Sequence, residues 1–300
     1  MASLQNSGIL VVDKPTGITS HRVLERLKRL ARRSKLGHGG TLDPFATGVL
    51  PVFVQRATRL VQFFLHGDKE YEGRIRFGWA TDTHDLDGAP LGPAQPCGAG
   101  PADLEAWVQE FRGRIRQRPP AFSAVKWQGE SLHVHARRGR PVEAREREVE
   151  VHRLEILEWD PPDLRIRVAC SAGTYIRVIA HELGARAGCG AHLTALRRLR
   201  SGPFTLDQAV PLEALEDNPA LLEERLLPME SLLPEFPACR CGADQVARVR
   251  NGNEIAFPPT GETEPEYVRL LDPEGRLLAV GRIVRRGESG LVVHPHVVLA

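Results

Sequence analysis

A single acidic side chain stands in a glycine-rich segment near the start of the chain, GHGGTLDPFATGVLPV, at residues 37–52. This acid is Asp43, and Pro44 follows it directly. Glycine lets a backbone approach a ligand closely, and proline biases the preceding residue toward an extended conformation. With no second carboxylate in the segment, Asp43 does not fit the paired acid and base of glycoside hydrolysis. It fits a lone nucleophile or an electrostatic stabiliser, and the alternative is an aspartate that only accepts hydrogen bonds in a turn.

The segment before this loop predicts a strand and a helix that could hold it. The apolar run GILVVDKPTG predicts a buried strand that ends at a Lys-Pro turn, and Thr19 or Ser20 can cap the helix that follows. The apolar stripe of this helix comprises Val23, Leu24, Leu27, Leu30 and Ala31. Its basic outer face comprises Arg22, Arg26, Lys28, Arg29, Arg32 and Arg33. Such a face is usually solvated, and phosphate contact is the alternative.

The central part of the chain carries strand and helix signals without a regular repeat. In KEYEGRIRFG and DLRIRVAC, mostly apolar positions alternate with mostly charged positions, which is typical of strands with one buried face. ADLEAWVQEFRG and TYIRVIAHELGARAG have helical periodicity, and Gly188 closes the second helix. Because strands outnumber helices and no βα repeat is visible, we expect an α+β fold with a mixed, mainly antiparallel sheet flanked by helices.

The C-terminal part predicts a separate small domain. Residues 212–233 are rich in leucine and acid and suit a helical connector. Beyond Pro234, the segments QVARVRNG, EYVRLLDPEGRLLAVGRIV and LVVHPHVVL predict short strands, and DPEG predicts a hairpin turn because its glycine can adopt a positive φ. We therefore expect a catalytic domain at residues 1–233 and a small all-β domain at residues 234–300.

The composition indicates the class of protein more clearly than it indicates a binding partner. The chain is 42% hydrophobic and 26% charged, as in an ordinary soluble globular protein. Its net charge of +2 argues weakly for a polyanionic partner, but only 5 of its 40 basic residues are lysine, which leaves 35 arginines. Guanidinium groups bind phosphate with paired hydrogen bonds and stack on bases, so the composition is compatible with nucleic acid. A biased base composition of the genome is the alternative.

The cysteines and the N-terminus indicate the compartment. The five cysteines lack the paired spacing of a zinc site, and Cys239 and Cys241 are too close in sequence to bind one tetrahedral ion well. We expect five free thiols in a reducing compartment. The segment MASLQNSGILVVDKP has no basic leader and only a short apolar run, so we expect a cytoplasmic protein that does not enter a membrane.

The loop around Asp43 resembles the catalytic motif of the TruB family of tRNA pseudouridine-55 synthases, Gly-His-x-Gly-x-Leu-Asp-Pro-x-Ala-x-Gly-x-Leu. Four further segments resemble the same family in the same order, namely DKPTGITS, KEYEGRIRFGWATDTHDLDG, RPPAFSAVK and SAGTYIRVIAHELG. The resemblance covers residues 9–204, and the tail resembles the RNA-binding PUA domain. It implies the pseudouridine synthase fold with a small PUA-like C-terminal domain.

The resemblance implies an isomerase. The family detaches one uracil of the tRNA T loop from N1, turns it, and rejoins it to the sugar through C5. Asp43 matches the family's catalytic aspartate. Tyr71 matches a residue that stacks on the flipped uracil, and Arg177 matches the residue that pairs with the aspartate. A neighbouring arginine lowers an aspartate pKa by about 1 to 3 units. Without the resemblance, Tyr71 would be interpreted as core packing and Arg177 as a residue on a helix surface.

Other matched positions concern the substrate and the shape of the loop. By resemblance, His38 helps to hold the RNA loop open where the base has left, Asp85 contacts the substrate, and Leu196 packs near the base. Lys14 and Pro15 match positions that are structural in the family.

A basic segment matches the loop with which the family clamps the T arm. Arg137, Arg138 and Arg140 lie in this segment, near residues 124–152, and their implied role is phosphate contact. An ordinary solvated loop is the alternative. The implied partner is tRNA, bound at its T arm and elbow by a monomer that needs no cofactor or metal ion.

Three classes of function remain open from the sequence. The favoured one is a cofactor-free RNA isomerase. A hydrolytic nucleoside glycosylase would need a placed water and a second acid, and the sequence offers no evident candidate for that acid. A noncatalytic RNA-folding chaperone is the third class, and it can coexist with the first.

Overall fold

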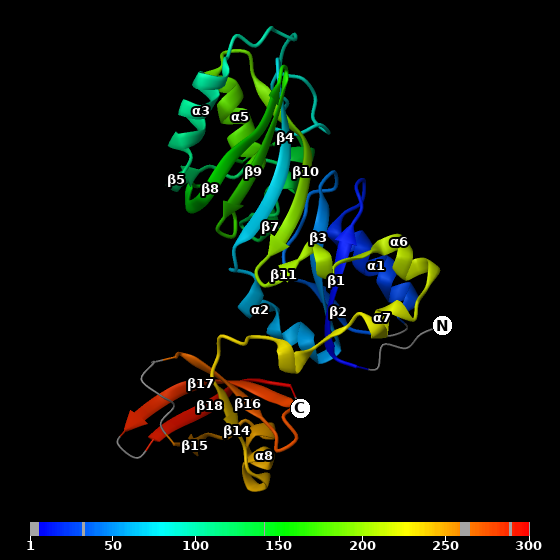
Figure 1. Ribbon diagram of the computed structural model, residues 1–300, viewed down its shortest axis with the longest axis vertical. Coiled ribbons are helices and arrows are strands. Elements are labelled where there is room, and N and C mark those ends of the chain that lie inside the picture. The colour runs from blue at the N-terminus through cyan, green and yellow to red at the C-terminus, as the bar shows by residue number, and fades with distance from the viewer. Residues whose placement is uncertain (1–5, 32–33, 141, 259–264, 288–289, 300) are drawn as a thin grey trace.

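A computed structural model of the chain describes residues 6–31, 34–140, 142–258, 265–287 and 290–299. Arg32 and Arg33, which were predicted on the basic face of the first helix, lie outside the described residues. The described residues form a large sheet with helices and a smaller sheet at one end of the molecule (Figure 1). The predicted α+β fold class is confirmed.

The large sheet comprises eleven strands in the described part of the chain. Its main path runs through β12 (Val210–Pro211), β1 (Gly8–Lys14), β3 (Thr47–Val54), β10 (Ala191–Ser201), β4 (Lys69–Phe77), β9 (Asp163–Cys170), β8 (Arg147–Asp160) and β5 (Gly113–Gln117). Three short strands join it at the side, β2 (Leu36–His38) on β3, β11 (Phe204–Thr205) on β10 and β13 (Leu227–Pro228) on β1. The pairs β1–β12 and β3–β10 are parallel, and the other pairs are antiparallel, as predicted.

Helices cover the large sheet at both of its ends. Near β8, β9 and β4 lie α3 (Pro101–Glu110) and α5 (Ile176–Arg186), and near β1 lie α1 (Ser20–Leu30) and α6 (Leu212–Asp217) (Figure 1). Thr19 caps α1, because its side chain accepts a hydrogen bond from the backbone N–H of Arg22 at 3.1 Å. The predicted cap is confirmed. The short η1 (Gln55–Leu60), α2 (Val61–Phe64) and α7 (Leu221–Glu224) complete the connections in this region.

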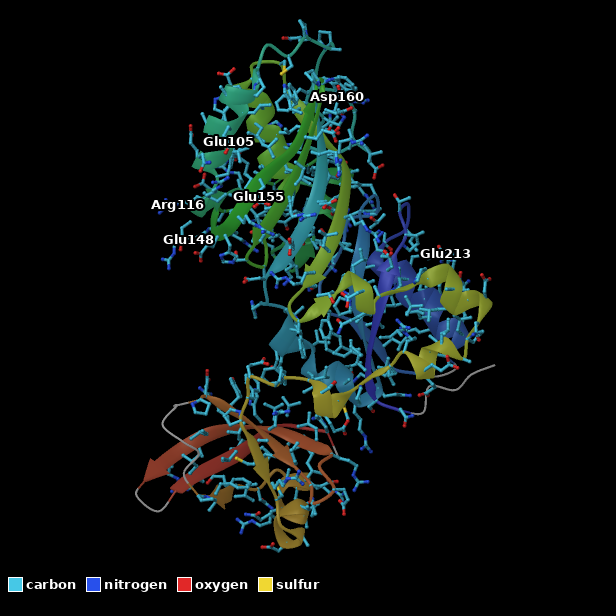
Figure 2. All side chains as sticks on the ribbon, in the orientation of Figure 1. Glu105, Arg116, Glu148, Glu155, Asp160 and Glu213 are labelled. Carbon is cyan, nitrogen blue, oxygen red and sulfur yellow. The ribbon has the colours of Figure 1, made fainter. Side chains whose placement is uncertain are left out.

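Strand β4 has the predicted alternation of buried and more exposed positions. Tyr71, Ile75 and Phe77 are buried together with residues of α3 and α5 in one apolar cluster between the sheet and these helices. The other face of the sheet carries charged side chains. Figure 2 labels two of them, Arg116 on β5 and Glu148 on β8, which are register partners at the edge of the sheet and are both exposed.

The smaller sheet has five strands in the described residues, in the order β14 (Ala238–Arg240), β16 (Tyr267–Leu271), β17 (Leu277–Gly287), β18 (Gly290–Val298) and β15 (Ile255–Phe257). The DPEG segment joins β16 to β17 as the predicted hairpin turn, and Gly275 in it has a φ of 87°. This sheet packs on α2, where the ring of Phe63 contacts the rings of Phe236 and Tyr267 edge-on.

Two local predictions were wrong. QVARVRNG was predicted as a strand, but Ala243–Arg250 form the helix α8, so the C-terminal β domain is not all-β. Helical spacing buries Val249, and Gln245 closes the first turn by accepting the backbone N–H of Gly242 at 2.9 Å. In the basic segment, a hairpin of β6 (Lys126–Trp127) and β7 (Glu130–Ser131) leads into a second unpredicted helix, α4 (Leu132–Arg137), whose first residue is buried.

Candidate active site

The loop that carries Asp43 is fixed from one side by Lys14 at the end of β1. Lys14 is fully buried, and its Nζ donates hydrogen bonds to the backbone oxygens of Pro15, Ile18 and Pro44 at 2.8, 2.7 and 3.1 Å. The Lys14 ammonium therefore ties the residue directly after Asp43 to the turn that follows β1. Pro15 lies in this turn, and the structural role expected of Lys14 and Pro15 stays a prediction.

Arg198 fixes the same loop from the other side. Its side chain is buried on β10, and it donates hydrogen bonds to the backbone oxygens of Val49, Thr41 and Gly40 at 2.7, 3.4 and 3.2 Å. Gly48 makes this approach possible, because it has a φ of 101° and a Cβ there would lie 2.2 Å from the backbone oxygen of Arg198. The glycine-rich loop is thus held by two buried cations that bind its backbone carbonyls.

Asp43 pairs with Arg177 of α5 at the centre of this site. The distance from Asp43 Oδ2 to Arg177 Nε is 2.9 Å, and Arg177 Nη2 donates a hydrogen bond to Asp43 Oδ1 at 3.2 Å. The side chain of Arg177 is only 3% exposed and that of Asp43 is 33% exposed. The surface position that residue pattern alone suggested for Arg177 is therefore wrong. The resemblance placed it correctly beside Asp43.

Arg177 also binds a second carboxylate, that of Asp85. Arg177 Nη1 donates to Asp85 Oδ2 at 3.0 Å and to the backbone oxygen of Thr83 at 3.0 Å, while Nη2 donates to the backbone oxygen of Phe122 at 3.0 Å. Asp85 is 5% exposed. One guanidinium consequently joins three segments of the chain, and its orientation toward Asp43 depends on all of them.

The pKa of the Asp43 carboxyl depends on its burial and on the charges around it. Burial raises the pKa of the Asp43 carboxyl, whereas the charge of Arg177 lowers it and that of Asp85 raises it further. Lys14 also acts to lower the pKa of Asp43. Burial in turn lowers the pKa of Lys14 to about 8, and the charge of Asp43 opposes this shift. Arg177 and Lys14 therefore both favour the carboxylate form of Asp43.

Tyr71 and Leu196 lie in the same buried cluster as Leu42 and Phe45, which flank Asp43 in sequence. Burial raises the pKa of the Tyr71 phenol, and the charge of Arg198 and a hydrogen bond to it oppose this rise. Tyr71 is thus both a core residue and a neighbour of the candidate catalytic loop. An open groove of about 630 Å³ begins beside this cluster, and Phe45 and Leu196 belong to its lining.

His38 lies at the entrance to the same loop, on β2. Its register partner is Val52 of β3, and burial lowers the pKa of its imidazole, with smaller contributions from the charges of Arg198 and His21. Burial therefore favours the neutral form of the His38 imidazole. The structure leaves it near the loop but without a contact to Asp43.

The three arginines of the basic segment do not join the Asp43 site. Arg137 ends α4, and Arg138 and Arg140 follow it, all three exposed. Arg138 Nη1 donates to Glu130 Oε2 at 2.8 Å. Their position is that of a separate basic surface.

Two features of the site were missed from the sequence. The first is that Arg198 both holds the backbone of the Asp43 loop and acts on the Tyr71 phenol. Arg198 shares its strand face with Leu196, which lies two residues before it. The second is the anchor of α5: Gln117 Oε1 accepts the backbone N–H of Tyr175 at 3.0 Å, and its Nε2 donates to the backbone oxygen of Tyr175 at 3.3 Å. The parity of β10 could have indicated the first, whereas no local signal indicated the second.

Other kinds of site find no support among the residues that the structure describes. No helix there is long and apolar enough to cross a membrane. Nor does that part of the chain bring together three or more histidine, cysteine or acidic side chains that could hold a metal ion. All five cysteines are free thiols, as predicted.

A mainly antiparallel sheet with an arginine-paired aspartate on a loop beside it occurs here in a chain that the comparisons place in the class of the pseudouridine synthases. The chain belongs to the TruB family: the model of the TruB family pseudouridylate synthase N-terminal domain matches residues 28–176, and that of the tRNA pseudouridylate synthase B C-terminal domain matches residues 177–234. It is therefore an enzyme of the tRNA pseudouridine synthase type.

Individual relatives agree with this assignment. The tRNA pseudouridine synthase B of Solibacter usitatus is 43% identical over 97% of this chain and 99% of its own length, and that of Xanthomonas axonopodis is 42% identical over 90% and 92%. Among solved structures, a Cbf5-Nop10-Gar1 complex contains a chain with a TM-score of 0.74 and 31% identity over 98% of this chain and 85% of that one. An H/ACA ribonucleoprotein bound to a substrate RNA containing 2'-deoxyuridine contains another, with a TM-score of 0.73 and 29% identity over the same shares.

Proposed function

We propose that the protein converts the uridine at position 55 in the T loop of tRNA to pseudouridine, with Asp43 as the catalytic residue. The observation that carries this proposal is the pairing of Asp43 with the buried Arg177 in a member of the TruB family. The names of the relatives support tRNA as the substrate, and the related chain bound to a substrate RNA supports RNA binding.

The reaction moves one bond within the nucleotide. The bond from N1 of uracil to C1′ of the ribose breaks, the base turns, and C5 bonds to C1′. The hydrogen of C5 leaves as a proton, and N1 takes up a proton from water, so the product is an isomer of the substrate. Both fragments stay in the site, so the reaction consumes no cofactor. Asp43 would act as a nucleophile on C6 of the base, as a nucleophile on C1′, or as a stabilising charge while a glycal forms. Water must be kept from the detached uracil, and the buried apolar cluster beside Asp43 supports this.

The target base must leave its stack before it can react. Unstacking costs a few kcal/mol, and stacking on an aromatic ring returns about 1 to 3 kcal/mol. Tyr71 is the aromatic residue that we place against the flipped uracil, with Leu196 beside the base. His38, neutral at the entrance of the loop, would occupy the space that the base leaves in the RNA. Asp85 would act mainly through Arg177, because its carboxylate is bound there.

RNA binding would extend beyond the catalytic site. Arg137, Arg138 and Arg140 form an exposed basic surface that suits phosphates of the T arm. We assign residues 1–233 to catalysis and residues 234–300 to a PUA-like RNA-binding domain that contacts the tRNA elbow. We propose that the enzyme acts as a monomer.

The experiment that tests this proposal uses tRNA transcripts labelled with tritium at C5 of uridine. We expect one tritium per tRNA to be released to water, and no release from a transcript with cytidine at position 55. Free uracil in the products would indicate a hydrolytic glycosylase instead. Binding of the transcript without any release would contradict the isomerase and leave an RNA chaperone.

A further inference from the structure

Two histidines stack on each other where the loop at residues 81–88 meets α5. The ring centroids of His84 and His181 are 3.9 Å apart, and the ring planes are inclined by 5°. His84 has a φ of 62°, a left-handed conformation that residues with a side chain adopt rarely. Its surroundings must therefore hold it in place.

The stack is one of three contacts between the same loop and the same helix, and the others are the hydrogen bonds from Arg177 Nη1 to the backbone oxygen of Thr83 and to Asp85 Oδ2. Asp85 directly follows His84 and binds Arg177, and His181 follows Arg177 by four positions, on the same face of α5. Two consecutive loop residues thus contact two helix residues that are one turn apart. We call these four residues the loop clamp.

The histidine contact of the loop clamp depends on neutral rings. Burial lowers the pKa of His84 to about 4, with further lowering by the charges of His181 and Arg177, and burial also lowers the pKa of His181. Within the described residues, the Nδ1 atoms of both rings are buried without a hydrogen-bond partner. A protonated ring would bury an N–H with no acceptor and would add a positive charge beside Arg177.

The other charged groups on the elements around the stack are bonded elsewhere, exposed or half-buried. On the loop, Asp82 accepts the backbone N–H of Ala89 at 2.8 Å, and Asp87 is exposed. On α5, Glu182 is half-buried, and burial raises its pKa. On β10, His192 Nδ1 lies 3.0 Å from the backbone oxygen of Trp79. The carboxylate of Asp85 is bound by Arg177, and its Oδ1 also accepts hydrogen bonds from Thr83 Oγ1 and from the backbone N–H of Asp87.

We propose that His84 and His181 are positioning residues for the isomerisation, because their neutral stack holds Asp85 on Arg177 and thereby keeps the guanidinium aimed at Asp43. This inference rests on the proposed function of Asp43. Neither histidine touches Asp43, so their effect passes through Arg177. Loss of the stack, or protonation of either ring, removes one of the contacts that hold the loop on α5 and leaves Asp43 with a less fixed cation.

The kinetic test compares alanine and phenylalanine at both positions. We expect His84→Ala and His181→Ala to slow single-turnover tritium release by about tenfold to a hundredfold at neutral pH, as for other misplaced active-site groups. The rising limb of their rate against pH should also move to higher pH, because Asp43 loses part of the charge that favours its carboxylate. His84→Phe and His181→Phe keep a flat ring for stacking and should retain the wild-type profile.

A measurement of unfolding by denaturant, which does not depend on activity, tests the same stack. The pKa of His84 is about 4 in the folded protein and about 6.5 when unfolded, so the unfolded chain binds the proton first as the pH falls. Wild-type stability should be full above pH 6.5 and decrease toward pH 4. His84→Phe should lose less stability over this range.

The outcomes separate the two proposals. Wild-type rate and pH profile in both alanine variants would overturn the positioning role while leaving the proposed function intact. Equal slowing in the alanine and phenylalanine variants with an unmoved profile would indicate a merely structural stack and would also overturn it. No release by the wild-type enzyme would overturn the function, and the positioning role with it.

Discussion

Asp43 and Arg177 are separated by 134 positions in the chain, yet Asp43 Oδ2 lies 2.9 Å from Arg177 Nε. The same guanidinium binds Asp85, so a buried arginine on α5 orients two loops at once. This arrangement gives the candidate catalytic aspartate a fixed cation in a largely buried site. Such a site costs little reorganisation when charge develops in the reaction.

Removal of the guanidinium should make the reaction depend on higher pH. Arg177 acts to lower the pKa of Asp43 against the effect of burial, so in Arg177→Ala this pKa should rise further. Because the proposed reaction uses the carboxylate form of Asp43, the rate should fall by about a hundredfold or more at neutral pH and recover partly as the pH increases. Single-turnover tritium release measured across pH tests this. Arg177→Lys keeps the positive charge but loses the two-pronged guanidinium that binds the carboxylate. A wild-type dependence of the rate on pH in Arg177→Ala would contradict the pairing of Arg177 with Asp43.

Lys14→Met should affect both stability and chemistry. The variant leaves three backbone oxygens without their buried donor, which should cost about 3 kcal/mol of unfolding free energy. It also removes a charge that favours the Asp43 carboxylate, so the rising limb of the rate should move to higher pH.

Lys69→Met is the matched control for this variant. Lys69 is also buried and also donates to backbone oxygens, those of Leu65 and Gly67, but its charge does not act on Asp43. It should lose stability while keeping the wild-type pH profile. Identical profiles for Lys14→Met and the wild type would show that Lys14 only supports the loop.

Replacement of the basic surface should change the salt dependence of binding. With alanine at Arg137, Arg138 and Arg140 together, the slope of log affinity against log salt should decrease in magnitude by about 2 to 3. The single-turnover rate at saturating enzyme should remain near that of the wild type, since this surface does not touch the Asp43 site. Arg186→Ala, which removes an arginine paired with Glu110 at the helix layer, should keep the wild-type slope. An unchanged slope in the triple variant would indicate an ordinary solvated loop.

Local patterns predicted the elements that depend on local physics. The cap at Thr19, the alternation of β4 and the DPEG hairpin follow from short-range rules, and all three occur in the structure. The helix α8 was mistaken for a strand because Val246 and Val249 favour strands by type, while their spacing of three fits a helix equally well. In so short a segment, tertiary packing decides between the two.

The candidate site depended on contacts that no local pattern contains. The pairing of Arg177 with both Asp43 and Asp85 joins three distant segments, and periodicity alone placed Arg177 on a surface. Arg198 is a similar case, because a buried arginine requires carbonyl partners that only the folded loop supplies. The family resemblance supplied the pairing of Arg177 with Asp43 and named Asp85 as a substrate contact, but it supplied neither the pairing of Asp85 with Arg177 nor the role of Arg198.

The most direct test of the role of Asp43 is tritium release from tRNA labelled at C5, measured in parallel with tRNA binding for the wild type and for Asp43→Asn. Asparagine keeps the size of the side chain and removes its charge. We expect one tritium per tRNA from the wild type, none from the variant, and affinities that agree within about threefold, because the variant should lose the chemical step rather than binding. Near-normal release by Asp43→Asn would contradict the role of Asp43 as the catalytic residue.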